Sequence, residues 1–292
     1  MKTRDRIDTA IRLILITITC VIIFVPLYLV ILNSFKPYPE IAADIGAWPI
    51  EPTLENYAEA WRRLNFPNAL KNTLIITIFS SIGLVVFTGM TGYWIERRRS
   101  RVTKLFNVLI LSCMCVPFQG FMIAYAQMIG KLGLSGHLFG VILSFWVFSM
   151  PMSVFLVSGA VKSVPLEIEE AAHIDGCSAF ATFWRIVAPL IKGTLFTVVS
   201  LEVIYFWNDY LMTQFILTKP SSRTIQIAMQ SLFNEAFFAW DTAVAAVALS
   251  ILPLFIFFLI AQKQVLEGVT AGSVKGLSLI HISEPTRHLR IS

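Results

Sequence analysis

The stretch Pro165-Leu-Glu-Ile-Glu-Glu-Ala-Ala-His-Ile-Asp-Gly-Cys-Ser-Ala-Phe-Ala-Thr-Phe-Trp-Arg-Ile-Val-Ala-Pro189 is a polar interval between two long apolar runs. Ser163 is placed to cap a helix, Pro165 suits a first helical position, and the three glutamates favour the positive helix start. Asp175-Gly176 should end this helix, because glycine accepts the left-handed conformation of a C-terminal cap. The stretch therefore predicts a helical hairpin outside the membrane, to which another component docks.

The second helix of this hairpin is predicted to carry one apolar stripe. Phe180, Phe183, Trp184 and Val187 recur at spacings of three and four residues, which places them on one helical face. Pro189 then opens the next apolar run.

The composition indicates a chain whose main solvent is lipid. Hydrophobic residues make up 56% and charged residues 14% of its 292 residues. A membrane-spanning helix needs about 20 apolar residues, and a helix satisfies its own backbone hydrogen bonds in lipid. We therefore expect an all-α integral membrane protein with six transmembrane helices. The expected spans are Ile11–Leu32, Ala69–Ile95, Leu105–Ile129, Leu138–Val161, Leu190–Leu217 and Thr242–Gln262.

The positions of the basic residues predict the orientation of the spans. Cytoplasmic connections of membrane proteins are enriched in Lys and Arg. The basic residues near the ends of these runs are Lys2, Arg4, Arg6, Arg97, Arg98, Arg99, Arg101, Lys104, Lys162, Arg185, Lys192, Lys263 and Lys275. Their connections should be cytoplasmic, which puts both termini inside and the acidic segment 33–68 outside.

The hairpin resembles a known loop. Glu170-Ala171-Ala172, three residues, Gly176, nine residues, Ile186, and Pro189 three further on are similar to the EAA loop of permease subunits of ATP-binding-cassette importers. More narrowly, the chain resembles MalG-type carbohydrate permeases. Supporting matches are Asn33-Ser-Phe-Lys36, Pro52-Thr-Leu-Glu-Asn-Tyr57, Trp207-Asn208-Asp209-Tyr210 and Glu267-Gly-Val-Thr-Ala-Gly-Ser-Val-Lys-Gly276. The departures are Cys177 and Ala188, where alanine and leucine are usual.

This resemblance implies a type I importer (MetI-like) permease fold with cytoplasmic EAA coupling helices in the loop 163–189. The expected ATPase-coupling residues are Glu170, Ala171, Ala172, Asp175, Gly176, Ile186 and Pro189. The implied partners are a second permease subunit, a cytoplasmic ATPase dimer and an extracytoplasmic solute-binding protein. ATP is used by the ATPase, and the chain itself has no Gly-x-x-x-x-Gly-Lys-[Ser/Thr] loop, so we expect no bound cofactor and no enzymatic activity. The alternative for the hairpin is an amphipathic helix lying in the lipid headgroups.

Glu202 is the main candidate for contact with a transported solute. A carboxylate within a span costs about 2.5–3.5 kcal/mol on insertion scales, so it should face protein or water. One interpretation places it on a sugar pathway with Tyr205, Trp207, Asn208 and Asp209, since aromatic faces and polar groups suit sugars. The other has Glu202 protonated or bonded to a neighbouring helix, with the aromatic residues at the membrane interface. Both interpretations remain open.

The second span should present a small-residue surface for close helix packing, formed by Ser80, Ser81, Gly83, Gly89 and Gly92. Pro117, Pro151 and Pro253 should set kinks. The four cysteines follow neither a disulfide nor a metal pattern, so no metal site is expected.

The positive net charge is explained by the cytoplasmic loops, which speaks against nucleic-acid binding. Residues 277–292, beginning Leu277-Ser-Leu-Ile-His-Ile, resemble the translation of a DNA-sequencing adapter, and we treat them as a non-native tail. The expected organisation is a cytoplasmic N-terminus over residues 1–10, a permease domain over 11–276 and this tail.

The expected function is the transmembrane pathway for a sugar or oligosaccharide in a bacterial inner membrane. A polyol or a glycerophosphoryl compound is an alternative solute. An ion-coupled carrier is a different class, but it would require paired intramembrane charges or inverted repeats, neither of which is evident.

Overall fold

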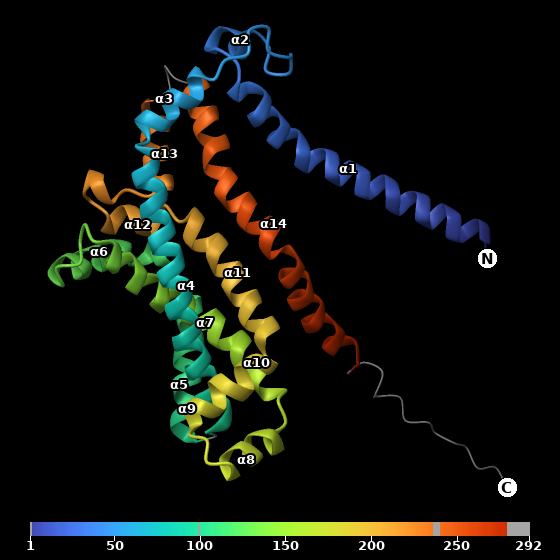
Figure 1. The fold of residues 1–292 in the computed structure, drawn as a ribbon, viewed down its shortest axis with the longest axis vertical. Helices are drawn as coiled ribbons and strands as arrows, with labels where there is room; N and C mark the ends of the chain where they lie inside the picture. Colours follow the sequence, from blue (N-terminus) through green and yellow to red (C-terminus); the bar gives the residue numbers. More distant parts are fainter. Residues whose placement is uncertain (1, 99, 236–239, 279–292) are drawn as a thin grey trace. The chain divides into compact units, whose positions relative to one another are not determined.

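The computed structural model describes residues 2–98, 100–235 and 240–278, and this part of the chain consists of helices and their connections (Figure 1). It forms two compact units. The first comprises residues 1–71 and 223–255, and the second comprises 72–222 and the residues from 256 onward. The predicted all-α class is confirmed. Of the predicted tail only Leu277 and Ser278, at the end of the last helix, are described, and residues 279–292 lie outside the described residues.

Four predicted spans lie within long continuous helices. They are α1 (Lys2–Ser34), α4 (Phe66–Arg97), α7 (Leu138–Lys162) and α14 (Trp240–Ser278). In the described part of the chain, these are the four helices long and apolar enough to cross a membrane, and a bent pair around Ile191 would make a fifth.

The predicted span Leu105–Ile129 is not one helix. It is divided into α5 (Arg101–Ser112) and α6 (Met122–Lys131) by the 3-10 turns η1 (Cys113–Cys115) and η2 (Phe118–Gly120). Pro117 has no backbone N–H and disfavours helical backbone in the preceding residue, and Val116 is indeed extended. The proline thus ends the helix rather than bending it.

The predicted span Leu190–Leu217 is also interrupted. Its main helix is α11 (Lys192–Asn208), and Asp209 separates it from the short helix α12 (Leu211–Ile216). At its start, the segment Ala179–Leu190 meets α11 at an angle of 83°.

The first unit is held by a polar cluster at the end of α1. The Lys36 side chain is 1% exposed and its Nζ donates to the carbonyl of Asp44 at 3.0 Å. Asn56 of α3 (Glu55–Arg63) donates to the carbonyls of Ser34 and Lys36, and the Ser34 and Tyr57 hydroxyls lie 2.6 Å apart. The segments Asn33–Lys36 and Pro52–Tyr57, two of the matches to the permease family, therefore join α1 to the connection that contains α2 (Tyr38–Ala43).

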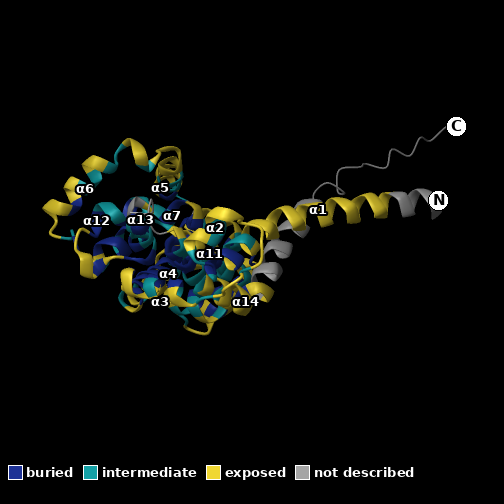
Figure 2. Ribbon diagram, turned by 90° about the horizontal axis from the view of Figure 1, so that it is seen from above, coloured by how far each residue is buried: buried dark blue, intermediate teal, exposed yellow. Residues whose placement is uncertain are grey.

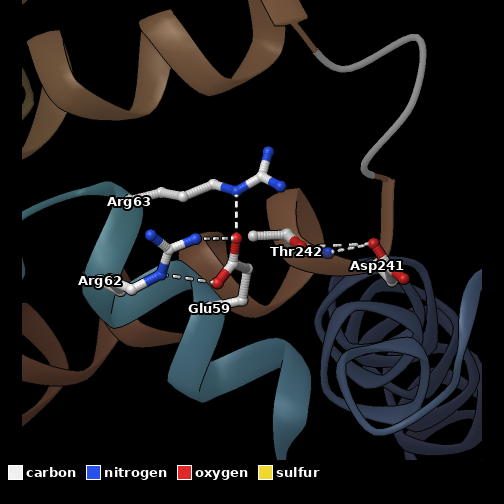
Figure 3. Close-up of polar contacts among 5 residues, drawn as sticks. All are labelled: Glu59, Arg62, Arg63, Asp241 and Thr242. Carbon is white, nitrogen blue, oxygen red and sulfur yellow. Dashed lines mark hydrogen bonds and ion pairs between the residues drawn. The ribbon is translucent and has the colours of Figure 1, made fainter.

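A surface cluster and a helix cap complete the polar contacts of this unit. Glu59 lies 2.7 Å from Arg62 and 2.6 Å from Arg63 along α3, and these hydrogen bonds lower the pKa of Glu59 to about 2 (Figure 3). Asp241 accepts from the Thr242 backbone N–H at 2.7 Å in the first turn of α14. Helix α13 (Ile225–Glu235) joins α14 through the Ser250 hydroxyl, which lies 2.7 Å from the Met229 sulfur.

The second unit is built on close packing between α4 and α7. A Cβ added at Gly92 would lie 2.9 Å from Val157 Cγ1 and 3.1 Å from the Ser158 backbone N, and one at Gly83 would lie 2.2 Å from Trp146 Cε2. The Trp146 indole N–H donates to the Ser80 carbonyl at 3.1 Å. The small-residue surface predicted for the second span is therefore confirmed at Gly83 and Gly92, which let α7 approach α4 closely.

Substitution of Gly92 by valine should separate α4 from α7. We expect a loss of about 1–3 kcal/mol of stability, because both a side chain and a backbone atom of α7 occupy the space that the new side chain needs. The melting temperature of the purified protein in detergent measures this. Gly159→Val on α7 is the matched control, since a Cβ at Gly159 meets nothing within 4 Å. Equal melting temperatures for the two variants would contradict the packing.

Candidate functional site

The predicted hairpin is present in the second unit. Helix α8 (Leu166–Ile174) is followed by a turn, the short helix α9 (Ala179–Thr182), a π-helical turn η3 (Phe183–Val187) and α10 (Ala188–Leu190) (Figure 1). Gly176 has a φ of 84°, as predicted for the residue that ends the first helix. The predicted start is wrong, because Ser163 bonds the Ala160 carbonyl behind it and Pro165 precedes the helix instead of occupying its first position.

The hairpin is tied to α4 by a buried ion pair. Glu169 is 4% exposed, and its Oε1 lies 2.6 Å from Arg97 Nη2 and 2.8 Å from Arg97 Nε. Its other oxygen accepts from the Tyr93 hydroxyl at 2.9 Å. A buried carboxylate needs this kind of full hydrogen bonding, because unpaired burial would be costly.

Arg97 also reaches the helix before the hairpin. Its Nη2 donates to the carbonyls of Val161, in the last turn of α7, and Val164, each at 2.9 Å. Carbonyls at a helix C-terminus lack intrahelical partners, and a guanidinium is well suited to them. A single side chain therefore holds together the ends of α4 and α7 and the start of α8.

The second half of the hairpin packs on α4 through Phe183. Phe183 and Val187 are fully buried, the Phe183 ring lies 5.3 Å from that of Tyr93, and a Cβ at Gly89 would lie 2.8 Å from Phe183 Cζ. Phe180, in contrast, is 62% exposed. The predicted single stripe is therefore wrong at Phe180. The π-helical turn places one extra residue in the turn and rotates the downstream positions relative to α9.

The outer surface of the hairpin combines acidic and apolar side chains. Glu167, Glu170, Ala171 and Ile174 follow helical spacing along α8 and are all exposed, Ile174 by 87%. Among the other predicted coupling residues, Asp175, Gly176 and Pro189 are exposed, Ile186 is half-buried and Ala172 is buried. The predicted ATPase-coupling residues thus include a surface that a partner could contact and one buried residue, Ala172, that packs beneath this surface.

Glu202 lies on α11 and faces α7. Its carboxylate accepts from the Ser149 hydroxyl at 2.6 Å and from the Ser153 hydroxyl at 3.4 Å, one helical turn further along α7. Pro151 lies between the two serines within the helix. Glu202 therefore joins the two helices across the point at which proline removes a backbone donor.

The remaining pathway candidates differ in what they contact. Tyr205 is 45% exposed beside Phe145, whereas Trp207 is only 4% exposed. Asn208 is exposed and donates to the Ile204 carbonyl. Asp209 accepts from the backbone N–H groups of Met212 and Thr213, so its carboxylate caps the start of α12.

Reasoning from the sequence missed the residues that hold the hairpin. Glu169 was one of three neighbouring acids with nothing to distinguish it, and Tyr93 and Arg97 lie more than 70 residues away. The sequence offers one signal, which is that Glu169 and Ala172 are three residues apart and therefore share one helical face. The structure shows that both are buried. No group of three His, Cys, Asp or Glu side chains suited to a metal ion occurs among the described residues.

Comparison with known proteins identifies the family. Residues 88–270 match the family described as binding-protein-dependent transport system inner membrane component, and the chain belongs to this family. It is 34% identical over 250 residues to a probable starch degradation products transport system permease protein of Thermoanaerobacterium thermosulfurigenes, with 86% of this chain and 91% of that protein covered. It is 31% identical over 255 residues to a melibiose/raffinose/stachyose import permease protein of Bacillus subtilis (strain 168), covering 87% and 92%.

The fold is also found in a solved transporter. A chain of a bacterial ABC transporter involved in the import of the acidic polysaccharide alginate superposes with a TM-score of 0.77 at 23% identity, covering 89% of this chain and 96% of that chain. This likeness confirms the importer permease fold.

Arg97→Ala should release the hairpin. The substitution leaves Glu169 buried without its cation, and breaking a buried pair in this way costs about 3–5 kcal/mol. We expect a lower melting temperature in detergent and faster proteolysis of the segment 163–189. Arg98→Ala is the matched control, because the Arg98 side chain is exposed. A normal melting temperature for Arg97→Ala would show that the ion pair does not hold the hairpin.

Proposed function

We propose that this chain is a permease subunit of an ATP-binding-cassette importer for a sugar or oligosaccharide. Its membership of the family, its four long apolar helices and the names of its relatives support this proposal.

The proposed topology has six spans, with both termini in the cytoplasm of a bacterial cell. The four long helices supply four of them. The α5–α6 pair supplies one interrupted span, and α11 with its flanking short helices supplies another. Interrupted spans of this kind are tolerated in transporters where the irregular backbone meets protein or water. The basic residues around the hairpin and at the end of α4 agree with a cytoplasmic location.

The hairpin is the proposed contact for the ATPase. The exposed face formed by Glu170, Ala171 and Ile174 offers a charge, a small residue that permits close approach and an apolar side chain that is 87% exposed. Because Glu169 beneath it is bonded to Arg97, a displacement of α8 pulls directly on α4 and on the end of α7. The buried Arg97–Glu169 pair is the single observation that carries this coupling, since it converts partner movement into rigid-body movement of spans.

The assembly requires partners that supply what this chain lacks. An ATPase dimer would hydrolyse ATP, a second permease would complete the pathway, and an extracytoplasmic binding protein would deliver the solute. Glu202, Tyr205 and Asn208 are the proposed solute contacts of this chain, with Trp207 and Asp209 supporting them through packing and through the cap of α12. A carboxylate, a phenol and an amide match the hydroxyl groups of a sugar.

Ile174→Asp should abolish ATPase binding without unfolding the hairpin, because Ile174 contributes nothing to the buried face. We expect co-purification of the ATPase to fall by about tenfold or more, as for a central interface residue. The matched control is Val102→Asp on α5, another exposed apolar residue, 67% exposed, outside the hairpin. Normal co-purification of Ile174→Asp, with the ATPase still active, would contradict docking at this face.

Transport should depend entirely on the ATPase. We expect proteoliposomes with both permeases, the ATPase and the binding protein to accumulate a radiolabelled neutral sugar from a panel of maltotriose, melibiose and raffinose only when ATP is enclosed. Omitting the ATPase tests the alternative of an ion-coupled carrier. Accumulation without ATPase, or uptake of glycerol 3-phosphate with none of the three sugars, would overturn the proposed function.

A further inference from the structure

Aromatic rings from the interrupted span between Arg101 and Lys131 gather with one ring from α7. This aromatic cluster consists of Phe118, Phe121, Tyr125 and Phe148. Phe118 begins η2, Phe121 immediately precedes α6, Tyr125 lies in the first turn of α6, and Phe148 comes from α7. The centroid of the Phe118 ring lies 5.5 Å from those of Phe121 and Phe148, and the Tyr125 and Phe148 centroids lie 5.3 Å apart. All four side chains are half-buried.

The backbone beside this cluster is not α-helical, because two 3-10 turns flank the extended residues Val116 and Pro117, and this restricts what can surround it. Residues 112–117, 119 and 120 are exposed, and Figure 2 shows α6 largely in the colour of exposed residues. Non-helical backbone at membrane depth is tolerated only where it is covered by protein or lines a water-filled cavity. Since the chain leaves this segment uncovered, lipid alone cannot surround it. Water in a solute pathway would meet the backbone that departs from the α-helical pattern here, and it would leave the rings accessible.

The cluster is apolar with a polar border and carries no charge. No Asp, Glu, Lys or Arg occurs between Lys104 and Lys131. The Tyr125 hydroxyl is hydrogen-bonded to the Ser144 hydroxyl, and the Gln119 amide is exposed in the turn between the first two rings. Aromatic faces cover the C–H surface of a pyranose, and hydroxyl and amide groups meet its hydroxyls, whereas an anionic solute would find no cation here.

We propose that the aromatic cluster is a binding surface for a neutral sugar ring passing through the permease, an inference that rests on the proposed function. It adds Phe118, Phe121, Tyr125 and Phe148 to the solute contacts of this chain and specifies an uncharged saccharide. The cluster adjoins the Glu202 contact through α7, because Phe148 and the Glu202-bonded Ser149 are consecutive residues. Two neighbouring faces of one helix thus carry a stacking surface and a hydrogen-bonding surface.

The double variant Phe118→Leu/Phe121→Leu tests this surface in the complete reconstituted transporter. Leucine keeps the apolar volume approximately but removes the aromatic faces. We expect uptake of whichever panel sugar the wild type transports to fall by about tenfold, the consequence of losing two aromatic contacts. ATP hydrolysis stimulated by the binding protein should stay within about twofold, since the hairpin is untouched, so the number of sugars moved per ATP falls.

The control and the rescue separate sugar contact from packing. Phe155→Leu changes a phenylalanine of α7 outside the cluster, 55% exposed, and should transport normally, and Phe118→Tyr/Phe121→Tyr should restore uptake. Uptake by the leucine variant equal to wild type overturns the proposal. Uptake and ATP hydrolysis that fall together, without rescue by tyrosine, also overturn it, because that pattern belongs to a structural role. If the wild type moves none of the panel sugars, the proposed function itself fails.

A labelling measurement tests the hydrated surface without altering the rings. In a variant with Cys20, Cys113, Cys115 and Cys177 replaced by serine, Gln119→Cys should react with a water-soluble methanethiosulfonate reagent. The transported panel sugar and its binding protein should slow this reaction during ATP turnover. A cysteine at position 119 that is inert to the water-soluble reagent but reacts with a lipid-soluble maleimide overturns the proposal, since lipid would then cover the surface. Labelling that the sugar leaves unchanged also overturns it.

Discussion

The buried pair between Arg97 and Glu169 is the interaction on which the arrangement of the second unit depends. Lipid cannot hold in a fixed position a hairpin that lies outside the membrane, as proposed here, and the hairpin is too short to have a core of its own. The chain solves this with one guanidinium that bonds a carboxylate of α8 and two carbonyls around the end of α7. Burial makes the contact demanding, because removal of either partner strands a charge. Because the buried charges must stay paired, the contact is rigid enough to transmit movement of the hairpin to the ends of α4 and α7.

The second constraint is the backbone in lipid. Four helices are long and apolar enough to cross a membrane without interruption, whereas the predicted third and fifth spans break at Pro117, Ile191 and Asp209. Each break frees backbone groups that lipid cannot satisfy, so each has to face protein or water. Asp209 meets this requirement by capping α12 with its own carboxylate. The segment at Pro117 has no comparable cap from a side chain among the described contacts, and the proposed hydrated surface would meet the requirement there.

Much of this could be predicted from residue type and spacing. The turn at Gly176 follows from the one residue that accepts a φ of 84° freely, and the small residues of α4 indicate close packing whatever their partner is. What could not be predicted depends on partners distant in sequence. Neighbouring Glu169 and Glu170 are chemically identical, and only Arg97 and Tyr93 make the first a buried anchor. Similarly, the spacing of Phe180 predicted that it belongs to the apolar stripe. The π-helical turn that changes the helical register cannot be recognised from the order of apolar residues.

Helix α7 connects the hairpin to the proposed solute surfaces. Its last turn is bonded by Arg97, and its middle carries Phe148 and Ser149, with Pro151 between the two regions. Proline removes one helical hydrogen bond and weakens resistance to bending there. Glu202 accepts a hydrogen bond from a serine on each side of that point, so α11 fixes the two sides of Pro151 relative to each other. A displacement of the end of α7 that Arg97 bonds would therefore act against the Glu202 contacts, and Pro151 is where displacement of the hairpin can become a change in the surface offered to the proposed solute.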